Sequence, residues 1–373
     1  MRNLARTRWV DVRDEWQLVR QLLPKGWEDK AKELGAIRRL RGIPSVETAL
    51  RILLMHLADG CSLKETSTRV AEAGWANISA VGILHRLRTA ERWLAWMAAG
   101  LRRPSKVSAL DRVCLAVDAT TITEPGPTGS LWRVHWSVNL ATLQCEFFEV
   151  TDVHGGEKFA RFPIEKDQLV MGDRGYSSSA GIDSVRQRGG HVLVRVNPMS
   201  LPLYGVKEGR RMKVLGRVRG MKVGQIRAWP AWVKGSDDRW HRGRVVAVKR
   251  SMAATRRELR HRRSNAKSRN RKLGPRGRAL ARYVLIWTSI PIAELSARQV
   301  LRHYRLRWQL ELVFKRAKSI MGLGQLPKYS DASSRAWLNG KLLVAMLVEK
   351  LWQEAEHFSP WGYDLFQPAE SVA

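Results

Sequence analysis

Four residues in the last third of the chain combine acidic, basic and aromatic side chains at helical spacing. Tyr304, Arg307, Glu311 and Lys318 follow one another at steps of three, four and seven residues. Because an α-helix turns about 100° per residue, these steps place all four side chains within roughly 60° of each other. A carboxylate among cations and an aromatic ring on one helix face is suited to holding a divalent cation beside a phosphate-bearing substrate.

Two aspartates far upstream, Asp118 and Asp173, each end an apolar run that predicts a β-strand. Carboxylates at strand ends can converge with a helix carboxylate at one edge of a sheet. Three of them make a hard-oxygen site for Mg²⁺ or Mn²⁺, and two such ions can promote cleavage of a phosphodiester. Each aspartate alone could instead be a turn or helix-cap residue, and Glu311 could simply pair with Lys315 on the helix surface.

The composition indicates a globular protein with an anionic partner. The 373 residues suggest two or three domains, and 44% of them are hydrophobic. The 66 Lys and Arg against 34 Asp and Glu give a net charge of +32, which favours nucleic acid because phosphate neutralisation releases counterions. An acidic membrane surface is the rival partner, but no apolar stretch reaches about 18 residues. The start of the chain lacks the apolar segment of a signal peptide, and three scattered cysteines indicate reduced thiols in the cytoplasm.

Residues 1–105 are predicted to form a helical DNA-binding domain. Helices are expected to start after capping serines at Ser45, Ser62 and Ser79. The third helix is expected to carry three arginines, Arg86, Arg88 and Arg92. Two helices joined by a short Gly turn and followed by a basic helix are compatible with a helix-turn-helix DNA reader. An ordinary helical bundle with a solvated basic face fits the same pattern.

Residues 106–197 change to the period of β-strands, with two interspersed helices. Their order is βββαβαβ, which predicts a mixed sheet covered by helices and therefore an α/β fold. The second and third strands, joined by a short link at Thr142-Leu143, are expected to form a hairpin. The expected strands are 112–118, 132–140, 144–150, 168–173 and 191–196, and the expected helices are 157–162 and 180–188.

Residues 198–282 interrupt this plan as a basic insertion that is expected to be β-rich at first, with apolar pieces at 212–215 and 245–248. Its basic stretch 256–272 is predicted to be a helix, or an arm that orders on phosphate, that contacts nucleic acid. A solvated charged helix is disfavoured because like charges at i,i+4 repel each other. The candidate DNA-binding residues outside the helix motif are Arg262, Arg263, Lys267 and Arg269 here, and Arg174 beside the second aspartate.

Residues 283–355 are expected to complete the sheet and supply the helix that carries the acidic motif. A strand at 283–288 is followed by one long helix from Ser296 to about residue 320. A final apolar helix, 337–352, is expected to pack on the catalytic core. Residues 356–373 are expected to form a tail.

The residues resemble bacterial insertion-sequence DDE transposases of the IS-four type. That family is defined by a Tyr-x2-Arg-x3-Glu-x6-Lys signature, which Tyr304, Arg307, Glu311 and Lys318 match at every position. The family's element around its second acid is matched by Asp173, Gly175 and Tyr176. Its first acid, on the opening strand, is matched by Asp118.

The resemblance implies an RNase H-like fold in which Asp118, Asp173 and Glu311 are the catalytic residues and bind two Mg²⁺ ions, with Mn²⁺ as a substitute. It also implies that Arg307 and Lys318 hold DNA phosphates and that Tyr304 positions the strand. Some members hold a flipped base with a Trp on the strand that precedes the Glu helix. The aromatic residues on that strand here are Tyr283 and Trp287, and neither aligns clearly with that Trp.

The expected activity is cut-and-paste DNA transposition. A water molecule would release a 3′-hydroxyl at the transposon end, and this hydroxyl would attack target DNA. The expected partners are double-stranded DNA, as inverted-repeat ends and target, and a second copy of the chain on DNA, with no membrane. A cytoplasmic, nucleoid-associated location follows. Two alternatives are an RNase H-like metal-dependent nuclease without strand transfer and an inactive DNA-binding relative.

Overall fold

A computed structural model of the chain forms two compact units. The first unit consists of Met1–Arg103, Ile122–Ser130 and Arg316–Ala373, and the second of Pro104–Thr121 and Leu131–Lys315. The structure describes residues 15–102, 107–108, 112–124, 130–268, 270–319, 322–324, 326–327 and 330–356. Within these ranges no helix has both the length and the apolar character needed to cross a membrane.

The first unit is helical, and the three predicted N-caps are confirmed. Ser45, Ser62 and Ser79 accept hydrogen bonds from backbone N–H groups three residues downstream, at 3.0, 3.1 and 3.2 Å. Arg92 does not share a helix with Arg86, because the chain turns at residue 90 and a new helix begins. The helices are α1 (Glu15–Leu22), α2 (Trp27–Glu33), α3 (Val46–Ala58), α4 (Leu63–Glu72), α5 (Ala80–Thr89), α6 (Glu91–Leu101) and α13 (Asp331–Glu356).

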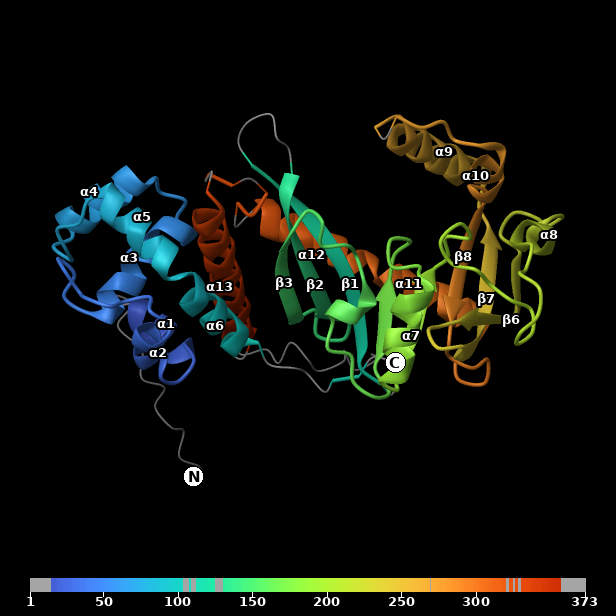
Figure 1. Cartoon of the computed structure of the whole chain (residues 1–373), viewed down its shortest axis with the longest axis horizontal. Helices are drawn as coiled ribbons and strands as arrows, with labels where there is room; N and C mark the ends of the chain where they lie inside the picture. Colours follow the sequence, from blue (N-terminus) through green and yellow to red (C-terminus); the bar gives the residue numbers. More distant parts are fainter. Residues whose placement is uncertain are drawn as a thin grey trace, which may run out of the picture. The chain divides into compact units, whose positions relative to one another are not determined.

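Helix α13 packs with the N-terminal helices of the first unit, so its expected packing on the catalytic core is wrong. It lies against α6, α3 and α5 (Figure 1). Gly340 allows this close approach, since a Cβ at that position would lie 2.4 Å from a methyl carbon of Leu57 on α3. The apolar pattern of residues 337–352 predicted the helix correctly, but it could not indicate which of two apolar surfaces would bury it.

The predicted mixed α/β architecture is confirmed by an eight-stranded sheet of order β3-β2-β1-β4-β5-β8-β7-β6. β1 pairs with β4 and β4 with β5 in parallel, whereas β2–β3, β5–β8, β8–β7 and β7–β6 are antiparallel. The predicted hairpin is confirmed, and Leu143 in its turn has a φ of 57°. The strands are β1 (Cys114–Thr123), β2 (Ser130–Asn139), β3 (Cys145–Asp152), β4 (Leu169–Gly172), β5 (His191–Arg195), β6 (Ile226–Lys234), β7 (Trp240–Lys249) and β8 (Tyr283–Thr288).

In the second unit, a hydrophobic core lies on each face of the sheet, because alternate side chains of the strands point to opposite faces. On one face, Val170 and Val194 are buried with Ile182 of α7 (Ser179–Gln187). On the other face, Met171 and Leu193 are buried with residues of α11 (Ala297–Leu306). Successive side chains of a strand point to opposite faces, so near-continuous apolar runs mark strands that are covered on both sides. The segment expected as a helix at 157–162 contains a 3₁₀ turn, η1 (Phe159–Arg161).

The insertion extends the same sheet and does not form a separate one. Strands β6 and β7 add to β8, so its expected β-rich character is found in the edge of the central sheet. Gly243 of β7 is needed where Trp287 of β8 passes, since a Cβ there would lie 2.4 Å from the indole ring. The apolar piece at 212–215 does not form a strand and instead leads into a helix. The helices of the insertion are α8 (Val214–Val218), α9 (Met252–Lys267) and α10 (Pro275–Leu280).

The expected single helix from Ser296 to residue 320 is wrong, because it is two helices, α11 and α12 (Trp308–Ser319), that meet at Arg307. The start is as predicted: Ser296 and Gln299 form a capping box. At the junction, the Leu310 N–H donates to the carbonyl of Arg307 at 3.1 Å, a three-residue step that tightens the backbone. The four signature residues therefore do not lie on one continuous helix face.

A buried carboxylate, Asp183 of α7, ties that helix to the β6–β7 turn. It accepts hydrogen bonds from His241 at 2.6 Å, Gln187 at 2.7 Å and the Ser236 N–H at 3.1 Å. Burial alone would raise the pKa of Asp183, but these bonds and Arg239 lower it to about 2. The ionised carboxylate is therefore part of the native packing.

Asp183→Asn should make the protein less sensitive to acid. A folded-state pKa below the ordinary value of about 3.9 stabilises the fold above pH ~4, and this contribution is lost as the pH falls toward 2. The free energy of unfolding of the variant, measured by urea denaturation between pH 5 and 2, should therefore fall less steeply with pH. Between wild type and Asp183→Asn, the slopes of the free energy of unfolding against pH should differ by up to about 1.4 kcal/mol per pH unit. Asp237→Asn, at an exposed aspartate that also contacts Arg239, should follow the wild type; equal slopes in all three proteins would contradict the prediction.

Candidate active site

Asp118 and Asp173 are brought together by the parallel register of β1 and β4. Ala116 of β1 pairs with Met171 of β4. Each aspartate follows its paired residue by two positions, so the two aspartates lie at matching positions of neighbouring parallel strands. Asp173 directly follows the last residue of β4, as expected. Asp118 lies in the middle of β1, because the strand continues to Thr123 and does not end at the acid. Successive side chains of a strand point to opposite faces of the sheet, so the Asp118 side chain lies on the same face as that of Cys114, four residues earlier. This is the face that α11 covers.

Arg307 joins two of the three predicted catalytic carboxylates. Its guanidinium donates to Asp118 Oδ2 at 3.0 Å and to Glu311 Oε1 at 3.0 Å. The junction between α11 and α12 places Arg307 opposite β1, and one turn of α12 brings Glu311 to the same guanidinium. The Arg307 side chain is 13% exposed and that of Asp118 is 20% exposed, so their contact is largely desolvated, whereas the Glu311 side chain is 50% exposed. In the structure Arg307 is therefore in direct contact with both Asp118 and Glu311.

The negative charge of Asp173 also acts on Arg307. Burial would lower the pKa of Arg307, but Tyr304, Asp118, Asp173 and Glu311 outweigh burial and raise it. Burial, reinforced by the negative charge of Asp173, raises the pKa of Asp118 to about 6 despite the opposing effect of Arg307. Two carboxylates thus contact Arg307 directly, and the charge of Asp173 also acts on it.

The remaining signature residues have different surroundings. The Tyr304 ring lies 5.8 Å from the Arg307 guanidinium and packs partly into the core under α11. Lys318 is exposed near the end of α12, with its stem about 3.7 Å from where a Cβ on Gly324 would lie. Because Lys318 belongs to the first compact unit, its place relative to the three carboxylates is not described.

The loop after β4 contains a feature that sequence reasoning missed. A Cβ at Gly175 would lie 1.8 Å from Oε2 of Glu157, so a larger residue there would require this fourth carboxylate to move. The hydroxyl of Tyr176 is fully buried and has no hydrogen-bond partner among the described residues. Burial raises the pKa of Tyr176, and Asp118, Glu157 and Asp173 add to the effect.

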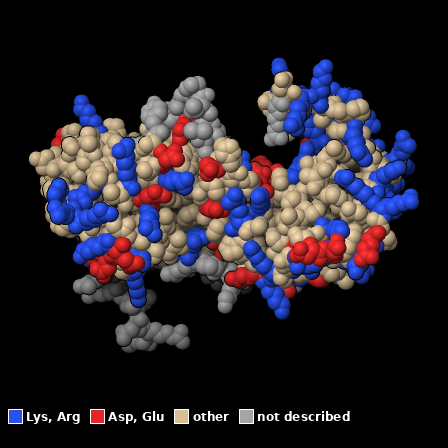
Figure 2. All heavy atoms as spheres, in the orientation of Figure 1, with Lys and Arg blue, Asp and Glu red and all other residues tan. Residues whose placement is uncertain are grey.

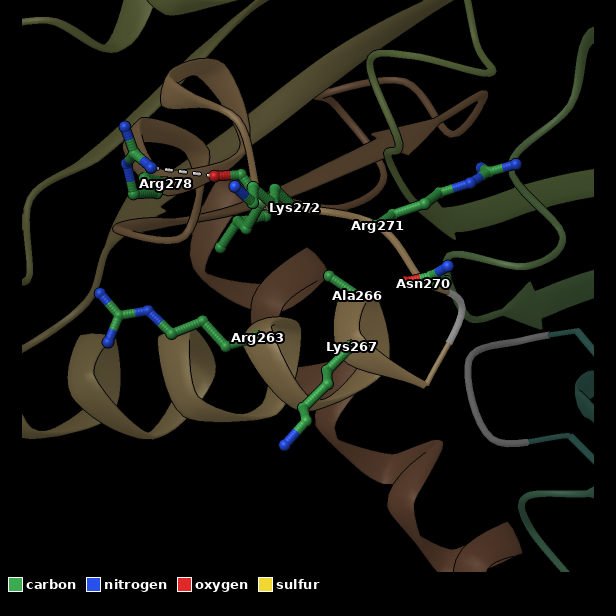
Figure 3. Close-up of a pocket in the computed structure, with 8 residues that line it drawn as sticks. Arg263, Ala266, Lys267, Asn270, Arg271, Lys272 and Arg278 are labelled. Atoms are coloured by element: carbon green, nitrogen blue, oxygen red, sulfur yellow. Dashed lines mark hydrogen bonds between the residues drawn. The ribbon is translucent and has the colours of Figure 1, made fainter.

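The predicted DNA-binding arginines divide into two sets. Arg174 and Arg262 both donate to the carboxylate of Glu258, at 2.8 and 2.7 Å. Arg263 and Lys267 line an open hollow of about 540 Å³ between α9 and the start of α10 (Figure 3). The other cations of this hollow are Arg271, Lys272 and Arg278. Arg269 lies outside the described residues. Figure 2 shows Lys and Arg gathered over the part of the second unit that carries this insertion.

The strand before α11 offers no exposed aromatic ring. Trp287 is fully buried, and its indole N–H donates to the Ala231 carbonyl at 3.1 Å. Tyr283 is 9% exposed and belongs to the same core. In this structure both side chains therefore serve the packing of the sheet.

The donor set of the site suits a divalent metal ion. The three residues offer carboxylate oxygens, which are the preferred ligands of Mg²⁺, and two of them, Asp118 and Glu311, contact Arg307. Among the described residues, no three acidic, His or Cys side chains lie close enough to hold one ion directly. Arg307 occupies the position between Asp118 and Glu311, so it would have to turn away before these carboxylates could bind metal.

The chain belongs to the family described as Transposase DDE domain, whose profile matches residues 109–347. Two relatives from Escherichia coli extend the likeness beyond that domain. One, from strain K12, is named as transposase InsL for insertion sequence element IS186A; it is 30% identical over 361 residues, covering 93% of this chain and 96% of the relative. The other is the transposase for insertion sequence element IS421, 30% identical over 362 residues with the same coverage.

A solved structure of a piggyBac transposase synaptic complex with hairpin DNA is also similar. It has a TM-score of 0.43 and 9% sequence identity, and covers 90% of this chain and 74% of that chain.

Proposed function

We propose that this chain is a cut-and-paste DNA transposase that cleaves transposon ends and joins the freed 3′-hydroxyl to target DNA. The observation that carries the proposal is that the guanidinium of Arg307 donates hydrogen bonds to both Asp118 and Glu311, at 3.0 Å each. The negative charge of Asp173 also acts on this guanidinium. The strand order β3-β2-β1-β4-β5, with β1, β4 and β5 parallel, supports an RNase H-like core. The family of the chain supports transposition as the reaction class.

Asp118, Asp173 and Glu311 would hold two Mg²⁺ ions, with Mn²⁺ as a substitute. When bound, such ions activate the attacking hydroxyl and stabilise the leaving oxygen of a phosphodiester. Arg307 would leave the two carboxylates as they take up metal, and its guanidinium would become available to a DNA phosphate. The protein supplies position and charge for this chemistry and forms no covalent bond to the substrate.

Double-stranded DNA, as the inverted-repeat ends and the target, is the proposed partner. The net charge of +32 and the basic hollow of α9 and α10 support it. The helical first unit is proposed to read the transposon end, because α3 and α4 are joined by the short segment 59–62 and are followed by α5, which carries Arg86 and Arg88. Both ends must be held together during the reaction, so a homodimer on DNA is proposed as the working form.

The experiment that tests the function measures cutting and joining separately. Full-length protein is incubated with a supercoiled plasmid bearing the element ends, in Mg²⁺ and in EDTA, and with precleaved ends plus a target plasmid. A transposase should cut only with metal and should also join precleaved ends. Cutting without joined products would support the RNase H-like nuclease instead, and binding without either product would support an inactive DNA-binding relative.

Lys318→Ala should weaken DNA binding in a salt-dependent manner. Lys318 is exposed on α12, and a lysine that neutralises one phosphate adds about 0.9 to the slope of log affinity against log salt. Fluorescence anisotropy with an end duplex between 50 and 200 mM salt should show a slope reduced by about one. Lys315→Ala, at another exposed lysine of the same helix, serves as the comparison. An unchanged slope for Lys318→Ala would exclude the phosphate contact.

A further inference from the structure

Four arginines converge on the single carboxylate of Glu258 on α9. Arg262 donates to it at 2.7 Å, Arg174 and Arg250 at 2.8 Å, and Arg195 at 3.0 Å. The Glu258 side chain is 11% exposed, and those of the arginines are 14–30% exposed. The arginines come from the loop after β4, from β5, from the residue after β7 and from α9 itself. The cluster therefore joins the insertion to the strands that carry the candidate active site.

This cluster carries more positive than negative charge. Four guanidiniums face one carboxylate, which leaves three positive charges without a partner in the cluster. Burial lowers the pKa of Arg174, and the neighbouring charges of Arg195 and Arg262 lower it further. Each guanidinium has five N–H donors in a rigid fork, and Glu258 uses few of them. The cluster thus retains both charge and donors for a second anion.

A small cavity of about 70 Å³ is lined by three of these four arginines. Arg174, Arg195 and Arg262 line it, together with Asn197 and Tyr283, whereas Arg250 does not. Among the residues that the structure describes, no acidic one lines the cavity. Arg174 is next in the chain to Asp173, so the cavity lies one residue from a proposed catalytic carboxylate. Glu258 holds the arginines in place without filling the space in front of them.

We infer that this cavity is a phosphate-binding subsite, organised by Glu258, that takes one phosphodiester group of the DNA strand entering or leaving the active site. The assignment of the ligand as DNA rests on the proposed function, whereas the affinity for phosphate rests on the cluster alone. Guanidinium forks match the oxygens of a phosphate in two-point hydrogen bonds, and such charge-assisted bonds are about twice as strong as neutral ones.

The test uses two closely matched arginines. Arg262 and Arg250 both contact Glu258, at 2.7 and 2.8 Å, with side chains 15% and 14% exposed. Each also donates to one backbone carbonyl, of Gly277 at 3.1 Å and of Ala281 at 3.2 Å. Only Arg262 lines the cavity. Replacing either by Gln should destabilise the fold by a similar amount, but only Arg262→Gln should change phosphate binding.

Binding of inorganic phosphate to full-length protein is measured by calorimetry without metal or DNA, at constant ionic strength set with chloride. Arg262→Gln should weaken phosphate binding at least about tenfold, whereas Arg250→Gln should change it less than about twofold. With an end duplex, Arg262→Gln should also lower the salt slope by about one. Arg195→Gln, at a second lining residue, provides the same comparison if Arg262→Gln does not fold.

No phosphate binding by the wild type, or equal losses in the lining and the Arg250 variants, would overturn the subsite. A protein that binds phosphate through Arg262 but neither cuts nor joins DNA would refute the proposed function and leave the subsite intact. A protein that transposes with an unchanged salt slope in Arg262→Gln would refute DNA as the ligand of the subsite.

Discussion

Glu311→Gln should abolish DNA cleavage while leaving binding to the element ends intact. The amide keeps the size of the side chain, but it removes one of the three charges that are proposed to hold metal. Metal ions supply several kcal/mol of transition-state stabilisation, and a loss of about 4 kcal/mol is a rate loss of about 10³-fold. Arg307 should keep its contact with Asp118, so the fold of the site should survive.

The measurement compares single-turnover cleavage of an end duplex with Mg²⁺ in wild type, Glu311→Gln and a control. Glu294→Gln is a suitable control, because Glu294 also pairs with one arginine, Arg112, and its side chain is 42% exposed against 50% for Glu311. The control should cut at the wild-type rate. Asp118→Asn and Asp173→Asn should behave as Glu311→Gln does. Cleavage by Glu311→Gln within tenfold of the control would remove this residue from the catalytic set.

Glu258→Gln should destabilise the second unit by about 3–5 kcal/mol, the usual effect of removing one partner from a buried ion pair. Burial by itself would raise the pKa of Glu258, but Arg195, Arg262, Arg250 and Arg174 hold it well below its ordinary range. The carboxylate is therefore ionised at neutral pH and is the common partner of all four guanidiniums. Without its charge the arginines would repel one another across the joint between α9 and the core.

Thermal unfolding at pH 7 provides the measurement. A loss of 3 kcal/mol should lower Tm by at least about 6 °C for a unit of this size. Glu294→Gln breaks a single, more exposed ion pair and should cost at most about 1 kcal/mol. A carboxyl with a lowered pKa in the folded state stabilises the fold fully only at pH values above its pKa in the unfolded chain, which is about 4. The difference in Tm between wild type and Glu258→Gln should therefore shrink as the pH falls below about 4. A Tm within 2 °C of the wild type at pH 7 would show that the cluster does not stabilise the unit.

Several elements could be predicted from local sequence because their cause is local. The serine caps at Ser45, Ser62, Ser79 and Ser296 bond to N–H groups three residues away, so the helix starts follow from spacing. Strands β4 and β5 follow from apolar runs that are buried on both faces. Asp173 was placed correctly because it directly follows such a run.

Other features depend on partners distant in the sequence, and local patterns could not predict them. The apolar stripe of α13 fits any apolar surface, and only tertiary packing put Leu57 against Gly340. The break at Arg307 arises where its side chain meets Asp118, 189 residues away. The charge density of residues 256–272 predicted contact with anions, but Glu258 already engages Arg262.

The sequence by itself determined which chemical groups are available: three carboxylates, the Tyr, Arg and Lys around Glu311, and a large excess of positive charge. It determined these because residue type and spacing are local properties. Tertiary structure alone decided that Arg307 bridges Asp118 and Glu311, that Glu157 packs at Gly175, and that four arginines share Glu258. Those pairings follow from strand order and from the extension of the sheet by the insertion, which bring together groups that lie far apart along the chain.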